Sequence, residues 1–379
     1  MDSSRPDAGQ SSGRLAGSRL DSLDGLRAIA VLLVIGYHWD VPGFSTGFFG
    51  VDMFFALSGF LITSLLMEEF ARTGDLSLRR FWTRRIRRLW PESWLLIAIS
   101  LTGPFVFGLG RGDRTDLSGI TALFQIHNWW KIATESNDSA WTGHLWSLSV
   151  EEQFYLVWPV IMFLVARAGR VHWRRAVFCA TTVLLTCSLT ASLLLREAGV
   201  SYLRLYFSSD IRASNILIGC LAAIVLQSHR KPIETMRRVV ANRFVAVATV
   251  IGVVTLSAHG LGVSTAPVAT MVGIAVPTLT TVLVAHLYVA RCGFPSRILG
   301  KRATAKIGRI SYGVYLWHFP IGNYLFIHLG RDFKSTILAL AVTLVAAELS
   351  TRFGRSVGTW LGRPKVRPRR TASRHPSLT

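Results

Sequence analysis

The sequence predicts an all-α polytopic membrane protein that crosses the bilayer about ten times, with both ends of the chain in the cytoplasm. Half of its 379 residues are hydrophobic and only 17% are charged, whereas a soluble domain carries about 25% charged residues. The basic residues lie between long apolar runs, so the net charge of +21 indicates the loops of a membrane protein rather than a nucleic-acid partner. The four cysteines show no CxxC motif and no metal-ligand spacing, so we expect neither a disulfide scaffold nor a metal site.

Ten apolar runs are long enough, or nearly so, to cross about 30 Å of hydrocarbon as helices. Arg27 interrupts the first run, and only a short turn containing Gly and Ser separates the seventh from the eighth. The runs cover residues 24–42, 48–67, 89–108, 147–166, 176–195, 211–228, 244–261, 267–290, 310–329 and 335–352.

The distribution of Lys and Arg orients these runs. If the chain starts in the cytoplasm, 33 of the 42 basic residues fall in cytoplasmic segments and 8 in external ones, and Arg27 lies within the first run. Basic residues concentrate in cytoplasmic loops, so the bias predicts an N-in, C-in topology. The apolar stretch 117–130 would reverse part of this topology if it crossed the membrane, but its 14 residues favour an interfacial or re-entrant segment.

The two ends of the chain differ from the apolar part in composition. Residues 1–22 are polar and rich in Ser, Gly and Arg, without the apolar core of a signal peptide, so we expect a disordered cytoplasmic tail. Residues 353–379 form a second, basic cytoplasmic tail, and its last part, 363–379, could touch anionic lipid. The transmembrane domain is therefore expected over residues 23–352.

Arg27 and His38 stand out in the first run because ionisable groups are rare within the membrane. They are eleven residues apart, which on a helix is three turns plus about 20°, so they share one face about 16 Å apart. Arg27 offers a fixed cation for an anionic ligand, and His38 offers a proton acceptor near neutral pH. Alternatively, Arg27 extends to the inner interface and His38 only caps the outer end.

Arg85 and Arg88 belong to a group of four arginines at the cytoplasmic mouth of the third run. They are one helical turn apart and can converge on one anion, and the guanidinium group binds phosphate bidentately. The sequence therefore indicates a phosphate clamp. A role in topology alone explains such a cluster equally well.

Two acidic and three further polar residues complete the set of candidates. Glu151 lies at the outer start of the fourth run and Asp52 near the outer end of the second, so either carboxylate could orient His38. Glu151 could instead complement a helix dipole, and Asp52 could pair with a base for stability. In the ninth run we expect contacts from His318, Ser311 and Tyr315, for which hydrogen bonds between helices are the simpler explanation.

Five blocks, in order, resemble the integral-membrane acyltransferase-3 family, the O-acyltransferases of bacterial surface sugars and some antibiotics. Arg27 followed by His38 resembles the Arg-x10-His signature of that family, and Arg85-x-x-Arg88 resembles its Arg-x-x-Arg motif. The segments 50–61 (GVDMFFALSGFL), 146–155 (WSLSVEEQFY) and 311–320 (SYGVYLWHFP) resemble three further blocks. The sequence departs from the family at Ser214, where an Asp is frequent. The resemblance covers about residues 23–352, and the chain looks like the standalone form without the fused SGNH-type esterase domain.

The resemblance implies an acyl-CoA donor, expected to be acetyl-CoA, that approaches from the cytoplasm as a substrate rather than a permanently bound cofactor. Arg85 and Arg88, with Arg27, would hold its phosphates. The acceptor would be a hydroxyl group of a sugar-containing molecule, either a cell-envelope glycan or a macrolide-type antibiotic. The protein is then expected in the bacterial plasma membrane.

The resemblance also implies roles at the reacting atoms. His38 would act as general base on the acceptor hydroxyl, oriented by Glu151 or Asp52. His318, Ser311 and Tyr315 would contact the acceptor or the thioester. The competing hypothesis is a polytopic transporter or lipid flippase with a polar path through the membrane, but such proteins frequently show repeated halves, and the sequence contains no visible repeat.

Overall fold

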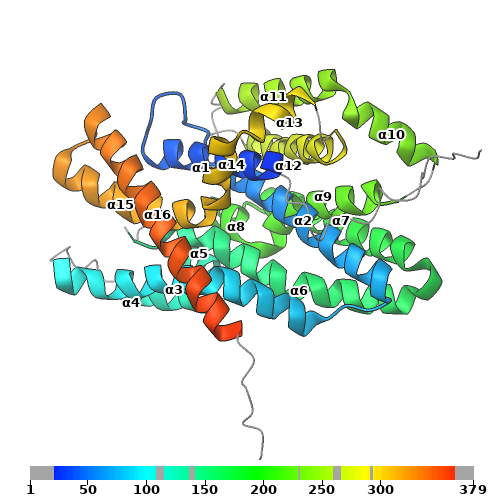
Figure 1. Cartoon of the computed structure of the whole chain (residues 1–379), viewed down its shortest axis with the longest axis horizontal. Helices are drawn as coiled ribbons and strands as arrows, with labels where there is room; N and C mark the ends of the chain where they lie inside the picture. The colour runs from blue at the N-terminus through cyan, green and yellow to red at the C-terminus, as the bar shows by residue number, and fades with distance from the viewer. Residues whose placement is uncertain are drawn as a thin grey trace, which may run out of the picture.

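The computed structural model describes residues 21–107, 115–135, 141–228, 231–258, 266–290 and 293–362, and the regular elements of this part are all helices (Figure 1). Each predicted apolar run lies largely on one long helix. These helices are α1 (Asp21–His38), α2 (Phe49–Thr73), α3 (Leu78–Phe107), α6 (Trp146–Gly169), α7 (Trp173–Glu197), α9 (Ser209–Leu226), α11 (Arg243–Ala258), α12 (Ala266–Val289), α15 (Ser311–Leu329) and α16 (Phe333–Gly362).

Short helices connect the long ones. They are α4 (Thr115–Leu123), α5 (His127–Thr134), η1 (Gly143–Leu145), η2 (Arg170–His172), α8 (Tyr202–Phe207), α10 (Lys231–Ala241), α13 (Phe294–Leu299) and α14 (Arg302–Arg309). The stretch 117–130 falls on α4 and α5, whose 9 and 8 residues are too few to cross the hydrocarbon at 1.5 Å per residue.

Five segments of the described chain are long and apolar enough to cross a membrane: 49–73, 143–169, 173–197, 202–226 and 333–361. The structure thereby confirms an all-α polytopic membrane architecture. Helices α1 and α3 are not among these five segments, and they carry more charged side chains, which are described below. The number of ten crossings and the N-in, C-in orientation stay predictions.

Most of the two predicted tails lies outside the part of the chain that the structure describes. Residues 1–20 and 363–379 lie outside the described residues. Helix α1 starts at Asp21, and α16 continues to Gly362 rather than ending near residue 352. The additional turns of α16 are tied to α3, because Arg87 Nη2 donates to the carbonyl oxygen of Leu361 at 2.9 Å.

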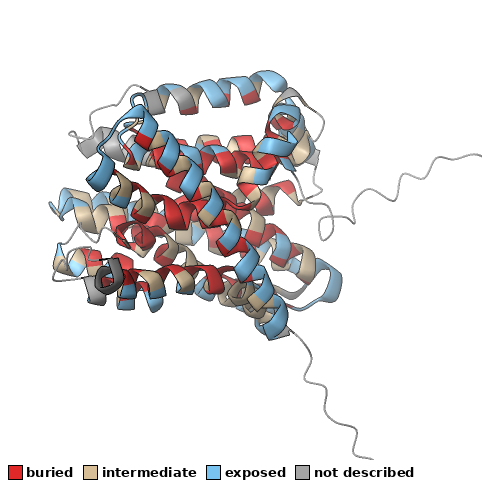
Figure 2. Cartoon of the chain, turned by 60° about the vertical axis from the view of Figure 1, so that its left-hand side comes forward, coloured by how far each residue is buried: buried red, intermediate tan, exposed pale blue. Residues whose placement is uncertain are grey.

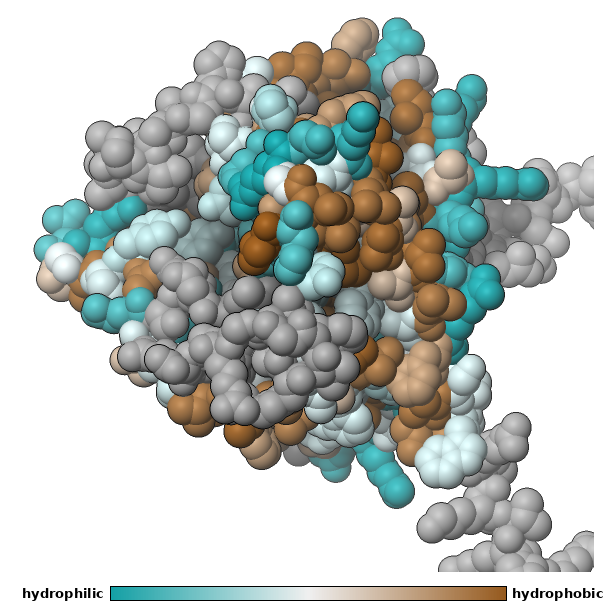
Figure 3. Space-filling view, turned by 90° about the vertical axis from the view of Figure 1, so that its left-hand side faces the viewer, coloured by the Kyte–Doolittle hydropathy of each residue, from teal (hydrophilic) through white to brown (hydrophobic). Residues whose placement is uncertain are grey.

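Helix α2 occupies the centre of the bundle and α7 its outside. Within the most apolar window of each helix, 83% of the residues of α2 but only 17% of those of α7 are buried. Figure 2 shows buried segments in the interior of the bundle and exposed faces on the helices around it. Apolar side chains gather in a patch on the face in Figure 3, beside hydrophilic ones, and large apolar residues such as Leu194 on α7 and Val345 on α16 are more than half exposed. Such surfaces suit contact with lipid tails.

Two glycines allow α2 to pack closely on α9. A Cβ atom at Gly59 would collide with the carbonyl oxygen of Ile216, and one at Gly219 would collide with that of Ala56. Small residues at such crossings let membrane helices approach each other closely. This contact places the polar residues of α2 directly against those of α9.

Candidate active site

A pair of histidines joins the end of α1 to the middle of α15. Nδ1 of His38 lies 2.9 Å from Nε2 of His318, although the two residues are 280 positions apart in the chain. The neighbouring Trp39 donates from its indole nitrogen to the carbonyl oxygen of His318 at 3.1 Å. Gly322 leaves room for that indole, because any Cβ there would collide with it. The end of α1 is therefore fixed on α15 by two adjacent contacts.

A third histidine, His144, completes this cluster. Its Nε2 donates to the carbonyl oxygen of Leu316 at 3.1 Å, and its ring centroid lies 5.3 Å from that of His318. The side chain is 1% exposed. The hydroxyl group of Tyr315 donates to the carbonyl oxygen of His144 at 2.9 Å and lies 2.5 Å from that of Ser147. Sequence reasoning missed His144 because it precedes the apolar run, although histidine within such a block is itself a signal.

Lys131 and His127 of α5 brace the segment that carries His144. Nζ of Lys131 donates to the carbonyl oxygen of Gly143 at 3.1 Å, and His127 has a hydrogen bond with the main chain of Thr142. Nδ1 of His127 also lies 3.1 Å from the hydroxyl group of Thr121 on α4. Burial, followed by the charge of Lys131, lowers the pKa of His127 to about 3. His127 is therefore neutral at physiological pH and adds no second charge beside Lys131.

Glu151 lies on α6 in a row of polar side chains that leads away from the histidines. Ser58 and Tyr155 both donate hydrogen bonds to its carboxylate. Ser147, Glu151 and Tyr155 are spaced four residues apart, so they share one face of α6. The row spans about 12 Å along the helix axis at 1.5 Å per residue. Its first member contacts Tyr315, beside the histidines.

Arg85 lies at the other end of this row. Its guanidinium carbon is 4.2 Å from the centroid of the Tyr155 ring, which is the geometry of a cation–π contact. It also interacts electrostatically with Glu152, whose carboxylate accepts a hydrogen bond from the indole of Trp90 at 3.3 Å. Polar side chains of α6 therefore connect Arg85 with the histidine cluster.

Asp52 is held by α9 rather than by His38. Its carboxylate lies 3.2 Å from Nη1 of Arg212 and accepts a hydrogen bond from Asn215 at 2.8 Å. Asp52 is 1% and Arg212 7% exposed, and the guanidinium lies 4.5 Å from the centroid of the Tyr206 ring. Among the hydrogen bonds of the described residues, neither Asp52 nor Glu151 bonds to His38. The hydrogen-bonding partners that the structure gives His38 are His318 and the main chain of Val34, one turn earlier on α1.

The remaining predicted residues occupy other parts of the bundle. Arg27 pairs with Asp24 one turn away, at 3.5 Å. Arg88 is an electrostatic neighbour of Glu92. Ser311 begins α15 and is buried, two turns before His318. No contact of the described residues joins Arg27 to Arg85, so a common clamp of these two residues stays a prediction.

Glu92 is a further buried acid that sequence reasoning missed. It lies within α3, is 5% exposed, and accepts hydrogen bonds from Ser350 and Thr351 of α16 at 3.4 and 3.1 Å. An ionisable residue inside an apolar run was the available signal. Its basic neighbours are Arg355 and Arg88, so it links the arginine cluster of α3 to α16.

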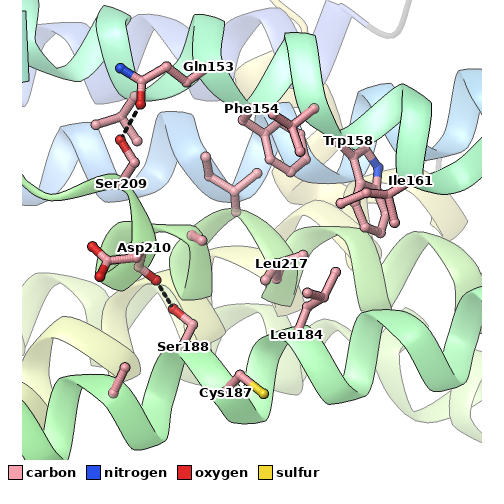
Figure 4. A pocket seen from close by; sticks show the side chains of 15 residues that line it. Gln153, Phe154, Trp158, Ile161, Leu184, Cys187, Ser188, Ser209, Asp210 and Leu217 are labelled. Atoms are coloured by element: carbon pink, nitrogen blue, oxygen red, sulfur yellow. Dashed lines mark hydrogen bonds between the residues drawn. The ribbon is translucent and has the colours of Figure 1, made fainter. Parts of the chain in front are cut away.

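A separate cavity of about 480 Å³ lies between α6, α7 and α9. Figure 4 shows its mainly apolar lining, with Gln153, Ser209 and Asp210 at one end. The hydroxyl group of Ser209 donates to Gln153 at 2.5 Å, and that of Ser188 donates to the carbonyl oxygen of Asp210 at 2.5 Å. None of the predicted site residues lines this cavity.

Comparisons with known proteins place the chain in a family. The acyltransferase-3 family model, described as an acyltransferase domain, matches residues 20–350. YrhL of Bacillus subtilis (strain 168) is 34% identical over 355 residues, covering 88% of this chain and 54% of its own length. O-acetyltransferase OatA of Staphylococcus aureus (strain NCTC 8325 / PS 47) is 31% identical over 347 residues, covering 88% and 56%. Peptidoglycan O-acetyltransferase OatA of Listeria monocytogenes (serovar 1/2a, strain ATCC BAA-679 / EGD-e) is 31% identical over 353 residues, covering 88% and 54%.

The chain thus spans about half the length of the curated relatives that it matches. No solved structure matches it. The relatives are bacterial, and the long apolar helices agree with the predicted location as a multi-pass protein of the bacterial cell membrane. The family match extends across the helices that carry the histidines, Glu151 and the arginine pair, in agreement with the resemblance of the five sequence blocks. The chain belongs to the integral-membrane acyltransferase-3 family.

Proposed function

We propose that the protein transfers an acyl group, most simply acetyl, from acyl-CoA to a hydroxyl group of a cell-envelope glycan. The family and the names of the relatives, O-acetyltransferase and peptidoglycan O-acetyltransferase, support the reaction type and this acceptor. The observation that carries the proposal is the row Ser147, Glu151 and Tyr155, which connects a cation at Arg85 with the pair of His38 and His318.

The donor would bind along this row. A guanidinium group forms charge-assisted hydrogen bonds with phosphate, so Arg85 and Arg88 would take the phosphates of the CoA moiety. The pantetheine arm is uncharged and long, and it can follow the hydroxyl groups of α6 toward the histidines. Arg85 faces Tyr155, which donates to Glu151, so a phosphate bound there would be held at one end of the row.

The chemical step needs one base. Nε2 of His38 would take the proton of the acceptor hydroxyl as its oxygen attacks the carbonyl carbon of the thioester. The carbon–sulfur bond then breaks, and the thiolate of CoA leaves with the proton from His38. The products are the O-acyl ester and CoA with a free thiol. Glu151 would keep Ser58 and Tyr155 in place along the donor path.

Acyl transfer can be measured with the full chain in proteoliposomes. Radiolabelled acetyl-CoA is added, and alkali-labile label is counted on peptidoglycan fragments, on a macrolide and in a reaction without acceptor. We expect label on the glycan fragments. Label on the macrolide alone would replace the acceptor class but keep the reaction. Movement of lipid or protons without any acyl transfer would support the transporter hypothesis instead.

The donor site has its own test. Replacing Arg85 by Gln removes a charge-assisted hydrogen bond worth about 1.5–3 kcal/mol, so we expect KM for acetyl-CoA to rise by about 10- to 100-fold. Arg84→Gln is the matched control, because Arg84 lies on the same helix but is 60% exposed beside Glu69. An unchanged KM in the Arg85/Arg88 double variant would contradict the phosphate clamp.

A further inference from the structure

The hydrogen bonds around His318 determine where its proton lies. Nδ1 of His318 lies 2.6 Å from the carbonyl oxygen of Tyr315. A carbonyl oxygen only accepts hydrogen bonds, so Nδ1 must carry the proton. A neutral imidazole has one N–H group, which leaves Nε2 of His318 as an acceptor. The proton position is thus inferred from the network of partners.

The same argument passes to the next ring. Nε2 of His318 lies 2.9 Å from Nδ1 of His38, and since Nε2 accepts, Nδ1 of His38 must donate. In neutral His38 the lone pair is then on Nε2, the nitrogen that faces away from this bond. The carbonyl oxygen of Tyr315 therefore acts through His318 on the tautomer of His38, which also has a hydrogen bond with the main chain of Val34.

The neutral state of both rings agrees with their surroundings. His318 is fully buried, and no carboxylate contacts either ring among the described residues. The side chains that face the pair are aromatic or neutral: His144, Tyr315, Phe319 and Tyr37. Lys131, whose charge acts on His38, is a cation and opposes a second positive charge. An imidazolium in apolar surroundings is costly when no counter-ion compensates its charge. We therefore infer that both rings are neutral at rest.

We propose that His318 is a positioning residue that holds His38 as the Nδ1–H tautomer, so that Nε2 of His38 is the base. This inference deepens the proposed function and rests on the general-base role of His38. It assigns to a histidine and a main-chain carbonyl the part that a carboxylate plays in hydrolase triads. When His38 takes the acceptor proton, its Nδ1–H···Nε2 bond to His318 becomes charge-assisted and stronger.

The tautomer can be read without any enzymatic turnover. Solid-state ¹⁵N NMR of the histidine-labelled full chain in lipid separates protonated from unprotonated ring nitrogens. The signals that disappear in His38→Gln identify His38. We expect a protonated Nδ1 and an unprotonated Nε2 for His38 in the wild type, and a mixture of both tautomers in His318→Leu. An Nε2-protonated His38 in the wild type would overturn the inference.

Kinetics give the second readout. In His318→Leu we expect kcat to fall by about 10²-fold or more, in line with the loss of general-base catalysis. KM for acetyl-CoA should stay within about 3-fold of the wild-type value, because the variant does not change how tightly the substrate binds before reaction. In His318→Gln the side-chain oxygen can accept from His38, so kcat should return to within about 10-fold of the wild type. Equal loss of kcat in the Leu and Gln variants would contradict a positioning role.

His286→Leu is the matched control. His286 is also a buried histidine, 1% exposed, whose Nδ1 bonds to a main-chain carbonyl oxygen, that of Val240. It lies on α12 outside the cluster, so its replacement should leave kcat unchanged. If the wild type transfers no acyl group but shows the expected tautomer, the proposed function fails and the geometry of the pair stands. If transfer occurs and the tautomer of His38 is reversed, only the positioning role of His318 fails, and the proposed function stands.

Discussion

Replacing Asp52 by Asn will destabilise the protein by leaving Arg212 as an uncompensated buried cation. The pair joins α2 to α9 at 3.2 Å, with Asn215 as a second partner of the carboxylate. Removing one member of a buried ion pair costs about 3–5 kcal/mol, because the other charge stays buried. The structure decides where in this range each variant falls.

The two single variants should differ. After Asp52→Asn, the guanidinium of Arg212 keeps its contacts with the rings of Tyr206 and Trp146, 4.5 and 5.6 Å away. A desolvated cation–π contact is worth about 2 kcal/mol, so the loss should lie near 3 kcal/mol. After Arg212→Met, the carboxylate of Asp52 keeps only Asn215 among the partners described, so the loss should lie near 5 kcal/mol. The double variant buries no charge here and should recover to within about 2 kcal/mol of the wild type.

The assay is the free energy of unfolding in detergent micelles for the two single variants and the double variant, with acyl transfer measured on the same preparations. A loss below about 1 kcal/mol in both single variants, or a double variant as unstable as the sum of the singles, would refute the reasoning. The double variant also separates the two roles of Asp52. A folded double variant that transfers acyl groups excludes Asp52 as the residue that orients His38. A folded but inactive one supports that predicted role.

Two further predictions concern packing and pH. Gly59→Leu should separate α2 from α9, because its side chain would collide with the carbonyl oxygen of Ile216, and a fall in the thermal unfolding midpoint would show this; an unchanged midpoint would contradict the close crossing. His127 has a lowered pKa of about 3 when folded and an ordinary value near 6.5 when unfolded, so the unfolded chain takes up the proton first as pH falls below 6.5. The free energy of unfolding should therefore fall by about 2 kcal/mol between pH 7 and pH 5 because of this residue. Denaturation measured at both pH values should show that His127→Gln loses this part of the pH dependence. The same pH dependence in the variant would contradict the buried neutral state of His127.

The sequence predicted the helices well because hydropathy is a local signal. The ten apolar runs coincide with ten long helices within a few residues at most ends, and α4 and α5 occupy the stretch predicted not to cross the membrane. The end of α16 was harder to predict. Its last turns carry charges outside the apolar run, and they are held by a contact with Arg87 on α3, 274 residues earlier.

At the candidate site, local sequence patterns identify single residues but do not predict which of them come into contact. His38 and His318 were both selected because they are ionisable groups in apolar runs, and the structure brings them together. Their pairing, however, depends on how α1 packs on α15, which spacing within one helix cannot reveal. The expectation that a carboxylate orients His38 followed from chemistry alone, whereas Asp52 is engaged by Arg212 across the α2–α9 crossing. Glu151 is engaged in the same way by Ser58 and Tyr155.

The most direct test of the account is acyl transfer by His38→Gln in the proteoliposome assay with peptidoglycan fragments and radiolabelled acetyl-CoA. The variant retains a polar side chain at this position but has no basic nitrogen. The account predicts that it folds and keeps its KM for acetyl-CoA, while kcat falls by at least about 10²-fold. Transfer at the rate of the wild type would contradict His38 as the general base.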